Sequence, residues 1–132
     1  MKLKDFGFRI WDENHKGCSS KDCKCQSKYT LGEHAKNMLS EFIGKDVEIE
    51  LWTRIIDRNG KKVYENDIVR MKSPYDCFIA KISIHKEGTF YLEGKNGDYM
   101  GSLIYLVEDE AYTIEIIGNI HENKNLLKRI EE

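Results

Sequence analysis

The fold is decided by one stretch of the chain, Ile55-Ile56-Asp57-Arg58-Asn59-Gly60-Lys61-Lys62-Val63-Tyr64-Glu65-Asn66-Asp67-Ile68-Val69-Arg70, in which two apolar runs flank a turn. Asn59-Gly60 is the strongest short signal for a β-hairpin, because both central residues of a type I′ turn need a positive φ angle, which Asn and Gly tolerate best. Next, Glu65-Asn66-Asp67 predicts a second tight bend, since short polar side chains satisfy nearby backbone donors there. We therefore expect a hairpin followed closely by a third strand.

Apolar and polar residues alternate on both sides of this stretch, which is typical of strands with one face on a core. Turn-forming residues at 73–76, 85–88 and 94–98 separate the alternating runs. The predicted strands cover residues 6–12, 47–51, 68–71, 78–84, 89–93, 99–107 and 112–117. Several short strands joined by tight turns indicate a small antiparallel barrel or sandwich.

The N-terminal part of the chain has a different pattern. Residues 13–28 are polar and lack periodicity, which predicts a long loop. Thr30 and Glu33 form a capping-box signature, apolar residues then recur at helical spacing, and Gly44 predicts the end of a helix over 31–43. A short C-terminal helix capped by Asn123 is also expected. The predicted fold class is mainly β (α+β), with a strand, a cysteine-bearing loop and a helix in residues 1–46 and a barrel in residues 47–132.

Size and charge limit the functional classes. A chain of 132 residues can bury roughly 65–70% of its unfolded surface, enough for one ordinary core. The 21 Lys and Arg residues against 23 Asp and Glu residues give a net charge of −2, which provides no overall attraction to nucleic acid or to anionic membranes. No apolar run is long enough to cross a bilayer. We expect a soluble, cytoplasmic protein with reduced thiols and no membrane contact.

One cluster of soft ligands lies in the polar loop. It comprises His15, Cys18, Cys23 and Cys25. Tetrahedral zinc needs four such ligands, but no Cys-x₂₋₄-Cys knuckle is present, and Cys23 and Cys25 flank a single residue. A solvated loop with reduced thiols is the first interpretation, and a zinc-stabilised module is the alternative.

The same loop carries the clearest basic patch of the chain, formed by Lys16, Lys21, Lys24 and Lys28. Lysines on a loop can contact phosphates, although charge runs of this kind are more often solvated surface. Nucleic-acid binding through residues 16–28 is therefore a second alternative.

Catalytic patterns are missing from the sequence. We find no phosphate-cradling glycine loop, no His-Glu-x-x-His zinc motif and no Gly-x-Ser-x-Gly nucleophile motif. His34 falls on the predicted helix, and His85 and His121 fall at turns. We therefore expect no enzymatic activity and no cofactor.

Three blocks of the sequence resemble the YopX family of phage and prophage proteins. They are Phe8-Arg9-Ile10-Trp11-Asp12, the run from Asp57 to Val69, and Ile114-Glu115-Ile116-Ile117-Gly118-Asn119-Ile120-His121-Glu122-Asn123. The resemblance implies an N-terminal α/β portion, a C-terminal SH3-like barrel, self-association into a homo-oligomer and a bacteriophage or prophage origin, so the expected location is the cytoplasm of a bacterial host. It implies no activity, because the function of the family is unknown. The chain departs from the family pattern at Asn66, which replaces Gly, and at Lys124, which replaces Pro.

The sequence contains more apolar residues than the core of a small barrel requires, and this surplus predicts contacts between subunits. The surplus consists of the helix at 31–43 and the outward positions Trp11, Trp52 and Ile79. The leading hypothesis is a non-enzymatic, oligomeric interaction module, with a host or phage protein as a further candidate partner.

Overall fold

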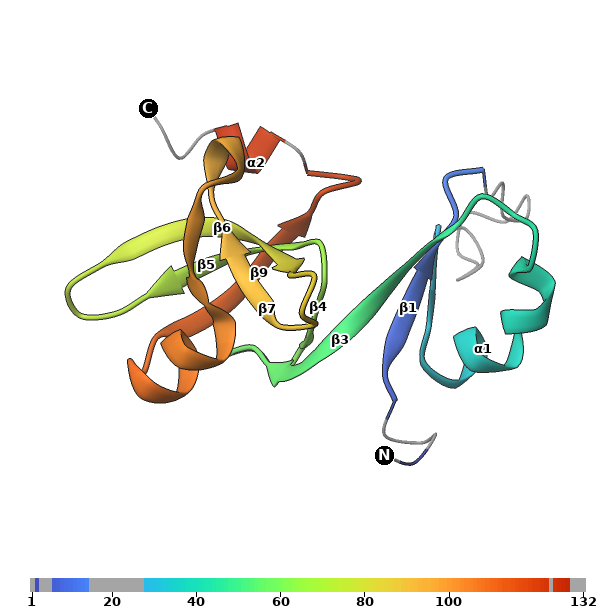
Figure 1. Ribbon diagram of the computed structural model, residues 1–132, viewed down its shortest axis with the longest axis horizontal. Helices are drawn as coiled ribbons and strands as arrows, with labels where there is room; N and C mark the ends of the chain where they lie inside the picture. Colours follow the sequence, from blue (N-terminus) through green and yellow to red (C-terminus); the bar gives the residue numbers. More distant parts are fainter. Residues whose placement is uncertain (1, 3–5, 15–27, 124, 129–132) are drawn as a thin grey trace. The chain divides into compact units, whose positions relative to one another are not determined.

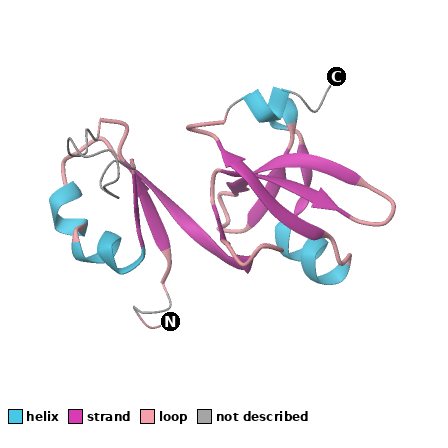
Figure 2. Ribbon diagram, turned by 180° about the vertical axis from the view of Figure 1, so that it is seen from behind, coloured by secondary structure: helices cyan, strands magenta, loops and turns pink. Residues whose placement is uncertain are grey.

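The computed structural model describes residues 2, 6–14, 28–123 and 125–128, and these form two compact units, residues 1–52 and 53–132. We call them unit 1 and unit 2. Strands dominate and the helices are short (Figure 2). The division at 46/47 that the sequence suggests stays a prediction. No helix among the described residues has the length and apolar character needed to span a membrane.

Unit 1 contains a small antiparallel sheet in which β1 (Phe8–Trp11) lies between β2 (Tyr29–Leu31) and the first residues of β3 (Glu48–Ile56) (Figure 1). Phe8 lies opposite Leu51, and Ile10 lies opposite Ile49. Because side chains alternate along a strand, Phe8 and Ile10 share one face, where they pack with Ala35. The strand predicted at 6–12 is thus confirmed over Phe8–Trp11.

The helix predicted over 31–43 is shorter than expected and is broken at Met38. It consists of α1 (Gly32–Asn37) and the 3₁₀-helix η3 (Leu39–Phe42), and Gly44 follows with a positive φ of 84° as predicted. The capping-box prediction was wrong, because Thr30 belongs to β2, where it pairs with Ile10, and no side chain caps α1. Thr30, which the local sequence pattern predicts as a helix cap, is therefore part of a strand.

Unit 2 contains a five-stranded antiparallel sheet in the order β8-β7-β6-β5-β9, which curls into a half-barrel. The end of β3 forms a hairpin with β4 beside it. The other elements of the unit are β4 (Lys62–Tyr64), β5 (Asp67–Lys72), β6 (Cys77–Ile84), β7 (Phe90–Glu93), η4 (Lys95–Gly97), β8 (Tyr99–Ser102), η5 (Tyr105–Asp109), β9 (Thr113–Asn119) and α2 (Asn125–Lys128). The fully buried core side chains include Val63, Val69, Met71, Ile82, Leu92 and Leu103. This arrangement confirms the mainly β prediction.

The hairpin at Asn59-Gly60 forms, but its turn is longer than the two-residue type I′ turn predicted. Asp57 N donates to Lys61 O at 2.7 Å and Gly60 N donates to Asp57 O at 3.0 Å, while only Gly60, at φ 82°, has a positive φ angle within the turn. A type I turn followed by a left-handed glycine has this pattern. The second bend is confirmed, since Asn66 adopts φ 69° and the Asp67 carboxylate accepts the Tyr64 N–H at 2.8 Å.

The predicted strand at 99–107 was wrong in its second half. β8 ends at Ser102, and residues Tyr105–Asp109 form the π-helix η5. Leu103 is fully buried, and Leu106 and Val107 pack against the same core. This i, i+3, i+4 spacing is typical of a helix face, so a helical turn buries these side chains together. At the C-terminus, Asn123 Oδ1 accepts the Asn119 N–H at 3.2 Å.

Candidate functional site

The residues that the sequence singled out for chemistry fall mostly outside the described part of the chain. These are His15, Lys16, Cys18, Lys21, Cys23, Lys24 and Cys25. Lys28 is described, and its Nζ lies 3.5 Å from Glu13 Oε1 and 5.8 Å from the centre of the Trp11 ring. Zinc binding and nucleic-acid binding by the loop stay predictions.

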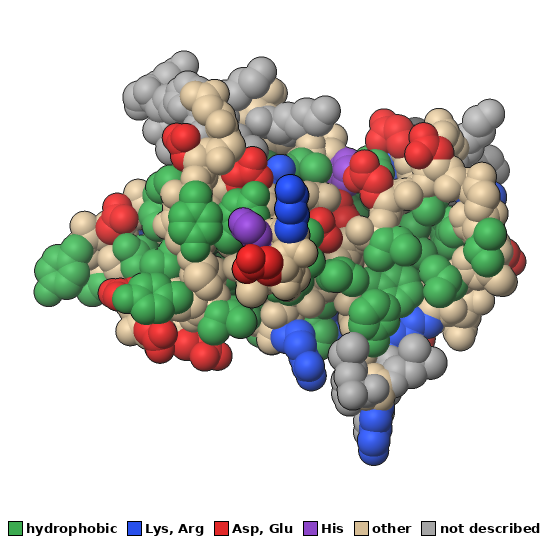
Figure 3. All heavy atoms as spheres, viewed as in Figure 1, with side chains coloured by type: hydrophobic (Ala, Val, Ile, Leu, Met, Phe, Trp, Pro, Cys, Tyr) green, Lys and Arg blue, Asp and Glu red, His purple; other side chains and the backbone are tan. Residues whose placement is uncertain are grey.

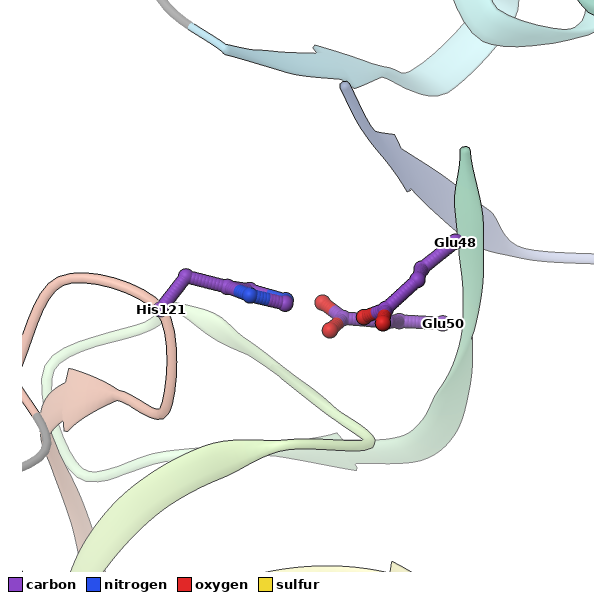
Figure 4. A group of neighbouring side chains, drawn as sticks. All are labelled: Glu48, Glu50 and His121. Carbon is purple, nitrogen blue, oxygen red and sulfur yellow. The ribbon is translucent and has the colours of Figure 1, made fainter. Parts of the chain in front are cut away.

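A polar and aromatic cluster occupies the second face of the sheet in unit 1. Arg9 Nε donates to Glu50 Oε1 at 2.7 Å, and the Tyr29 hydroxyl donates to the same oxygen at 2.9 Å. The Arg9 guanidinium lies 4.2 Å from the Tyr29 ring centre, a distance typical of a cation–π contact. Glu50 is 0% exposed, and Glu48 projects from the same side of β3 (Figure 4). The contacts made by Arg9 and Tyr29 compensate for the burial of the Glu50 charge.

Sequence reasoning missed this cluster because its members are far apart in the chain. Arg9 and Glu50 become direct neighbours only through the antiparallel register of β1 and β3. The sequence does carry one signal, which is a charged residue at an alternate position of each of two predicted strands. This signal indicates an ion pair only once the pairing of the two strands is known. Trp11 also belongs to this face, packs edge-on against Tyr29 and is buried. The expectation that Trp11 faces outward for subunit contacts was wrong.

A second buried carboxylate, Asp57, joins the hairpin to β9 in unit 2. Asp57 Oδ1 accepts the N–H groups of Asn59 and Lys61 at 2.9 and 2.8 Å, and Oδ2 accepts the Ile116 N–H at 3.1 Å. Burial acts to raise the pKa of Asp57, but the three N–H donors outweigh it and hold the pKa below the ordinary value of 3.8. The full set of local bonds gives Asp57 a structural role.

An exposed apolar surface follows the edge strand β8 and the start of η5. We call it the edge surface, and it consists of Tyr99 (65% exposed), Met100 (41%), Ile104 (53%) and Tyr105 (51%). Hydrophobic side chains are visible among acidic ones on the face of unit 2 that carries β8 and η5 (Figures 1 and 3). Large side chains that are exposed together at a sheet edge are candidates for contact with another protein.

The side chains of the edge surface are held by their neighbours. The Tyr99 ring stacks on Tyr91 with 5.6 Å between ring centres, and Tyr91 meets His85 edge-on at 5.8 Å. The Tyr105 hydroxyl donates to Glu110 Oε1 at 2.8 Å, and this hydrogen bond to a carboxylate raises the pKa of Tyr105. Tyr99 and Tyr105 therefore present their rings in defined positions.

The backbone of β8 is poorly suited to pairing with a strand of another chain. The ladder between β7 and β8 shifts register at Leu92 and Glu93, and Gly101 adopts φ 137°. A Cβ atom at Gly101 would lie 3.0 Å from Leu106 Cδ1, so a glycine lets η5 pack closely against β8. Bulges of this kind protect sheet edges from strand addition. Any association here uses side chains.

Comparison with protein families accounts for nearly the whole chain. The model of the YopX protein family matches residues 7–128. This range includes the predicted hairpin, the buried carboxylates of Glu50 and Asp57, and the edge surface. Among curated proteins, none matches the chain. Because the family match spans both units, the protein belongs to the YopX family, a family of phage-type proteins of unknown function.

Proposed function

We propose that the protein is a non-enzymatic interaction module in the cytoplasm of a bacterial host, in which copies of the chain associate through the edge surface of unit 2. Two of its residues, Ile104 and Tyr105, are adjacent in the chain and both about half exposed. Removing such apolar area from water stabilises association by about 25 cal/mol per Å². The exposure of four large apolar side chains within the short run 99–105 is the observation that carries this proposal.

A two-fold contact is the commonest form of association between copies of one chain, and we propose it here. A two-fold interface brings the same patch of both subunits together, so each ring meets apolar area on the partner. The acidic side chains Glu108, Asp109 and Glu110 follow directly in the sequence, and all three are exposed. Like charges at the rim restrict how closely two copies approach, which favours a contact centred on Tyr99 and Ile104.

The proposal includes a finer description of the fold. We assign residues 47–132 to an SH3-like barrel and residues 1–46 to an N-terminal appendage. Support comes from the curled sheet β8-β7-β6-β5-β9 with the β3–β4 hairpin beside it, and from the resemblance of the hairpin sequence to the family pattern.

Size-exclusion chromatography with light scattering tests the proposed association. The wild-type chain, of 15.5 kDa, should elute at micromolar concentration with a mass that is a multiple of this value. Ile104→Lys places a charge in the centre of the edge surface and should weaken association by about 2 kcal/mol or more, as expected for an interface hot spot.

Ile43→Lys is the matched control, because Ile43 is an exposed apolar residue of unit 1 and lies outside the edge surface. This variant should keep the wild-type mass. A wild-type chain that stays at 15.5 kDa would contradict the proposal, as would an Ile104→Lys variant that assembles like the wild type.

A further inference from the structure

A shallow groove in unit 2 is lined by residues that do not belong to the edge surface. It is formed by the β3–β4 turn, the end of β5, the turn that follows it and the start of β9. The groove has a volume of about 730 Å³ and is lined by Arg58, Lys72, Ser73, Pro74, Ala111 and Thr113. Two of these side chains are cationic and Thr113 carries a hydroxyl group, so the lining offers hydrogen-bond donors to an anion, whereas the Ser73 hydroxyl donates to Asp76 O at 3.5 Å.

Both cations stand on well-fixed backbone. Arg58 N donates to Ile114 O at 2.9 Å, which attaches the turn to β9. Lys72 is the last residue of β5, paired with Cys77 of β6 on one side and with Thr113 of β9 on the other. Fixed backbone limits the conformational entropy that these residues lose when their side chains bind a ligand.

On the exposed face of β5, one cationic residue has an acidic partner on β9 and the next cationic residue has none. Arg70 pairs with Glu115 across β5 and β9, with 2.8 Å between Arg70 Nη1 and Glu115 Oε1. Two residues further along β5, on the same face, Lys72 lies opposite the uncharged Thr113. Within the part of the chain that the structure describes, neither Lys72 nor Arg58 forms an ion pair. These two positive charges are therefore available to an external anion.

An exposed aromatic residue follows the groove lining in the sequence. Tyr75 follows Pro74 of the lining and is 97% exposed. Its turn is closed by Ser73 Oγ, which accepts the N–H groups of Tyr75 and Asp76 at 3.2 and 3.0 Å. The Asp76 carboxylate next to it is engaged, since it accepts the Cys77 N–H at 2.9 Å and the Tyr112 hydroxyl at 3.3 Å. A fixed turn thus carries an exposed aromatic side chain one residue beyond the groove lining.

We propose that this groove binds single-stranded nucleic acid, with Arg58 and Lys72 contacting phosphates and Tyr75 stacking on a base. A cationic groove combined with an exposed aromatic ring is the pattern by which proteins hold single strands without reading their sequence. The acidic run 108–110 precedes Ala111 in the lining, and the whole chain carries a charge of −2, so binding is weak. This site is separate from the lysines of residues 16–28.

Fluorescence anisotropy with a labelled oligothymidine of about twelve nucleotides tests the proposal, because single-strand sites cover about 4–16 nucleotides. Titrations between about 20 and 200 mM salt should give a slope of log K against log salt near −1.4, the value for about two phosphate contacts. Arg58→Gln and Lys72→Gln should each reduce this slope to about −0.7. Tyr75→Ser should weaken binding by roughly tenfold, whereas Tyr75→Phe should keep it.

Lys86→Gln is the matched control, because it removes one exposed positive charge from the β6–β7 turn of the same unit. It should leave the slope unchanged. The proposal is overturned if the oligonucleotide does not bind at low salt, if Arg58→Gln and Lys72→Gln bind like the wild type, or if Lys86→Gln reduces the slope as much as they do. Because all these substitutions are at exposed positions, thermal unfolding of each variant should match that of the wild type.

Discussion

Glu50 in unit 1 and Asp57 in unit 2 are both buried carboxylates, but different kinds of partner hold them. Glu50 depends on side chains from other strands, Arg9 of β1 and Tyr29 of β2, at separations of 41 and 21 residues. Asp57 depends on backbone N–H groups, two of which lie within four residues of it in the same turn. The comparison shows two ways to compensate for the burial of a charge, one set by tertiary pairing and one set mainly by local geometry.

The largest effect should come from breaking the side-chain arrangement. Arg9→Leu removes the Arg9 guanidinium from the buried Glu50 carboxylate, and breaking a buried pair in this way typically costs about 3–5 kcal/mol of unfolding free energy. Urea unfolding at neutral pH measures this loss. The double variant Arg9→Leu/Glu50→Leu should recover most of it, because two apolar residues replace the pair. A single variant that loses less than about 1 kcal/mol would show that the pair contributes little, as at an exposed site.

Breaking the backbone arrangement should cost less unfolding free energy, because two of its N–H donors belong to Asn59 and Lys61, which are exposed residues of the turn. Asp57→Ala leaves three N–H groups without their acceptor and should lower the free energy of unfolding by about 2–3 kcal/mol. Asp76→Ala is the control, since that exposed carboxylate accepts one backbone N–H, from Cys77, and one tyrosine hydroxyl. Asp76→Ala should lower the free energy of unfolding by about 0.5 kcal/mol. If Asp57→Ala and Asp76→Ala lowered the free energy of unfolding equally, Asp57 would have no special structural role.

The response to pH sharpens the contrast. The folded-state pKa of Asp57 is lowered below 3.8, so the unfolded chain binds a proton more readily than the folded one. Its contribution to stability is therefore complete above that value and is lost as the pH falls through the folded pKa. In urea unfolding, the stability difference between the wild type and Asp57→Asn should be constant near neutral pH and shrink below about pH 4. A difference that grows on acidification would mean that the pKa is raised.

The smallest effect on the free energy of unfolding should come from an exposed ion pair. Arg70 and Glu115 lie on the outer face of β5 and β9, and the Arg70 side chain is about half exposed. Arg70→Gln should therefore change the free energy of unfolding by only about 0.5 kcal/mol, and added salt should reduce the effect further. A loss comparable to that of Arg9→Leu would show that exposure does not distinguish the two pairs.

Local sequence patterns predicted the features that depend on neighbouring residues. The hairpin at Asn59-Gly60, the bend at Asn66 and the glycine after the helix at Gly44 all require backbone conformations that few residues adopt. Those residue types could be recognised directly. The exact turn was not predicted, because Asp57 closes it with its carboxylate, and a pattern of two central residues does not include that bond.

Features that depend on tertiary pairing were missed. β2 has only three residues and follows a long polar segment, so it shows no periodicity, and its pairing with β1 sets its structure. The run Leu103-Ile104-Tyr105-Leu106-Val107 is ambiguous between strand and helix by hydrophobicity alone. Contacts of Leu103 and Leu106 with the core decide it. The edge surface also could not be predicted from hydrophobicity, because Ile104 and Tyr105 are exposed only when this run forms a helical turn.

Hydrogen exchange at two protein concentrations tests most directly the claim that copies of the chain meet at the edge surface. Between dilute and micromolar solutions, amides of residues 99–105 should become more protected, while those of the exposed turn at 73–76 should exchange at the same rate. Exchange over residues 99–105 that does not depend on protein concentration, in a sample that light scattering shows to be assembled, would place the contact elsewhere and contradict the account.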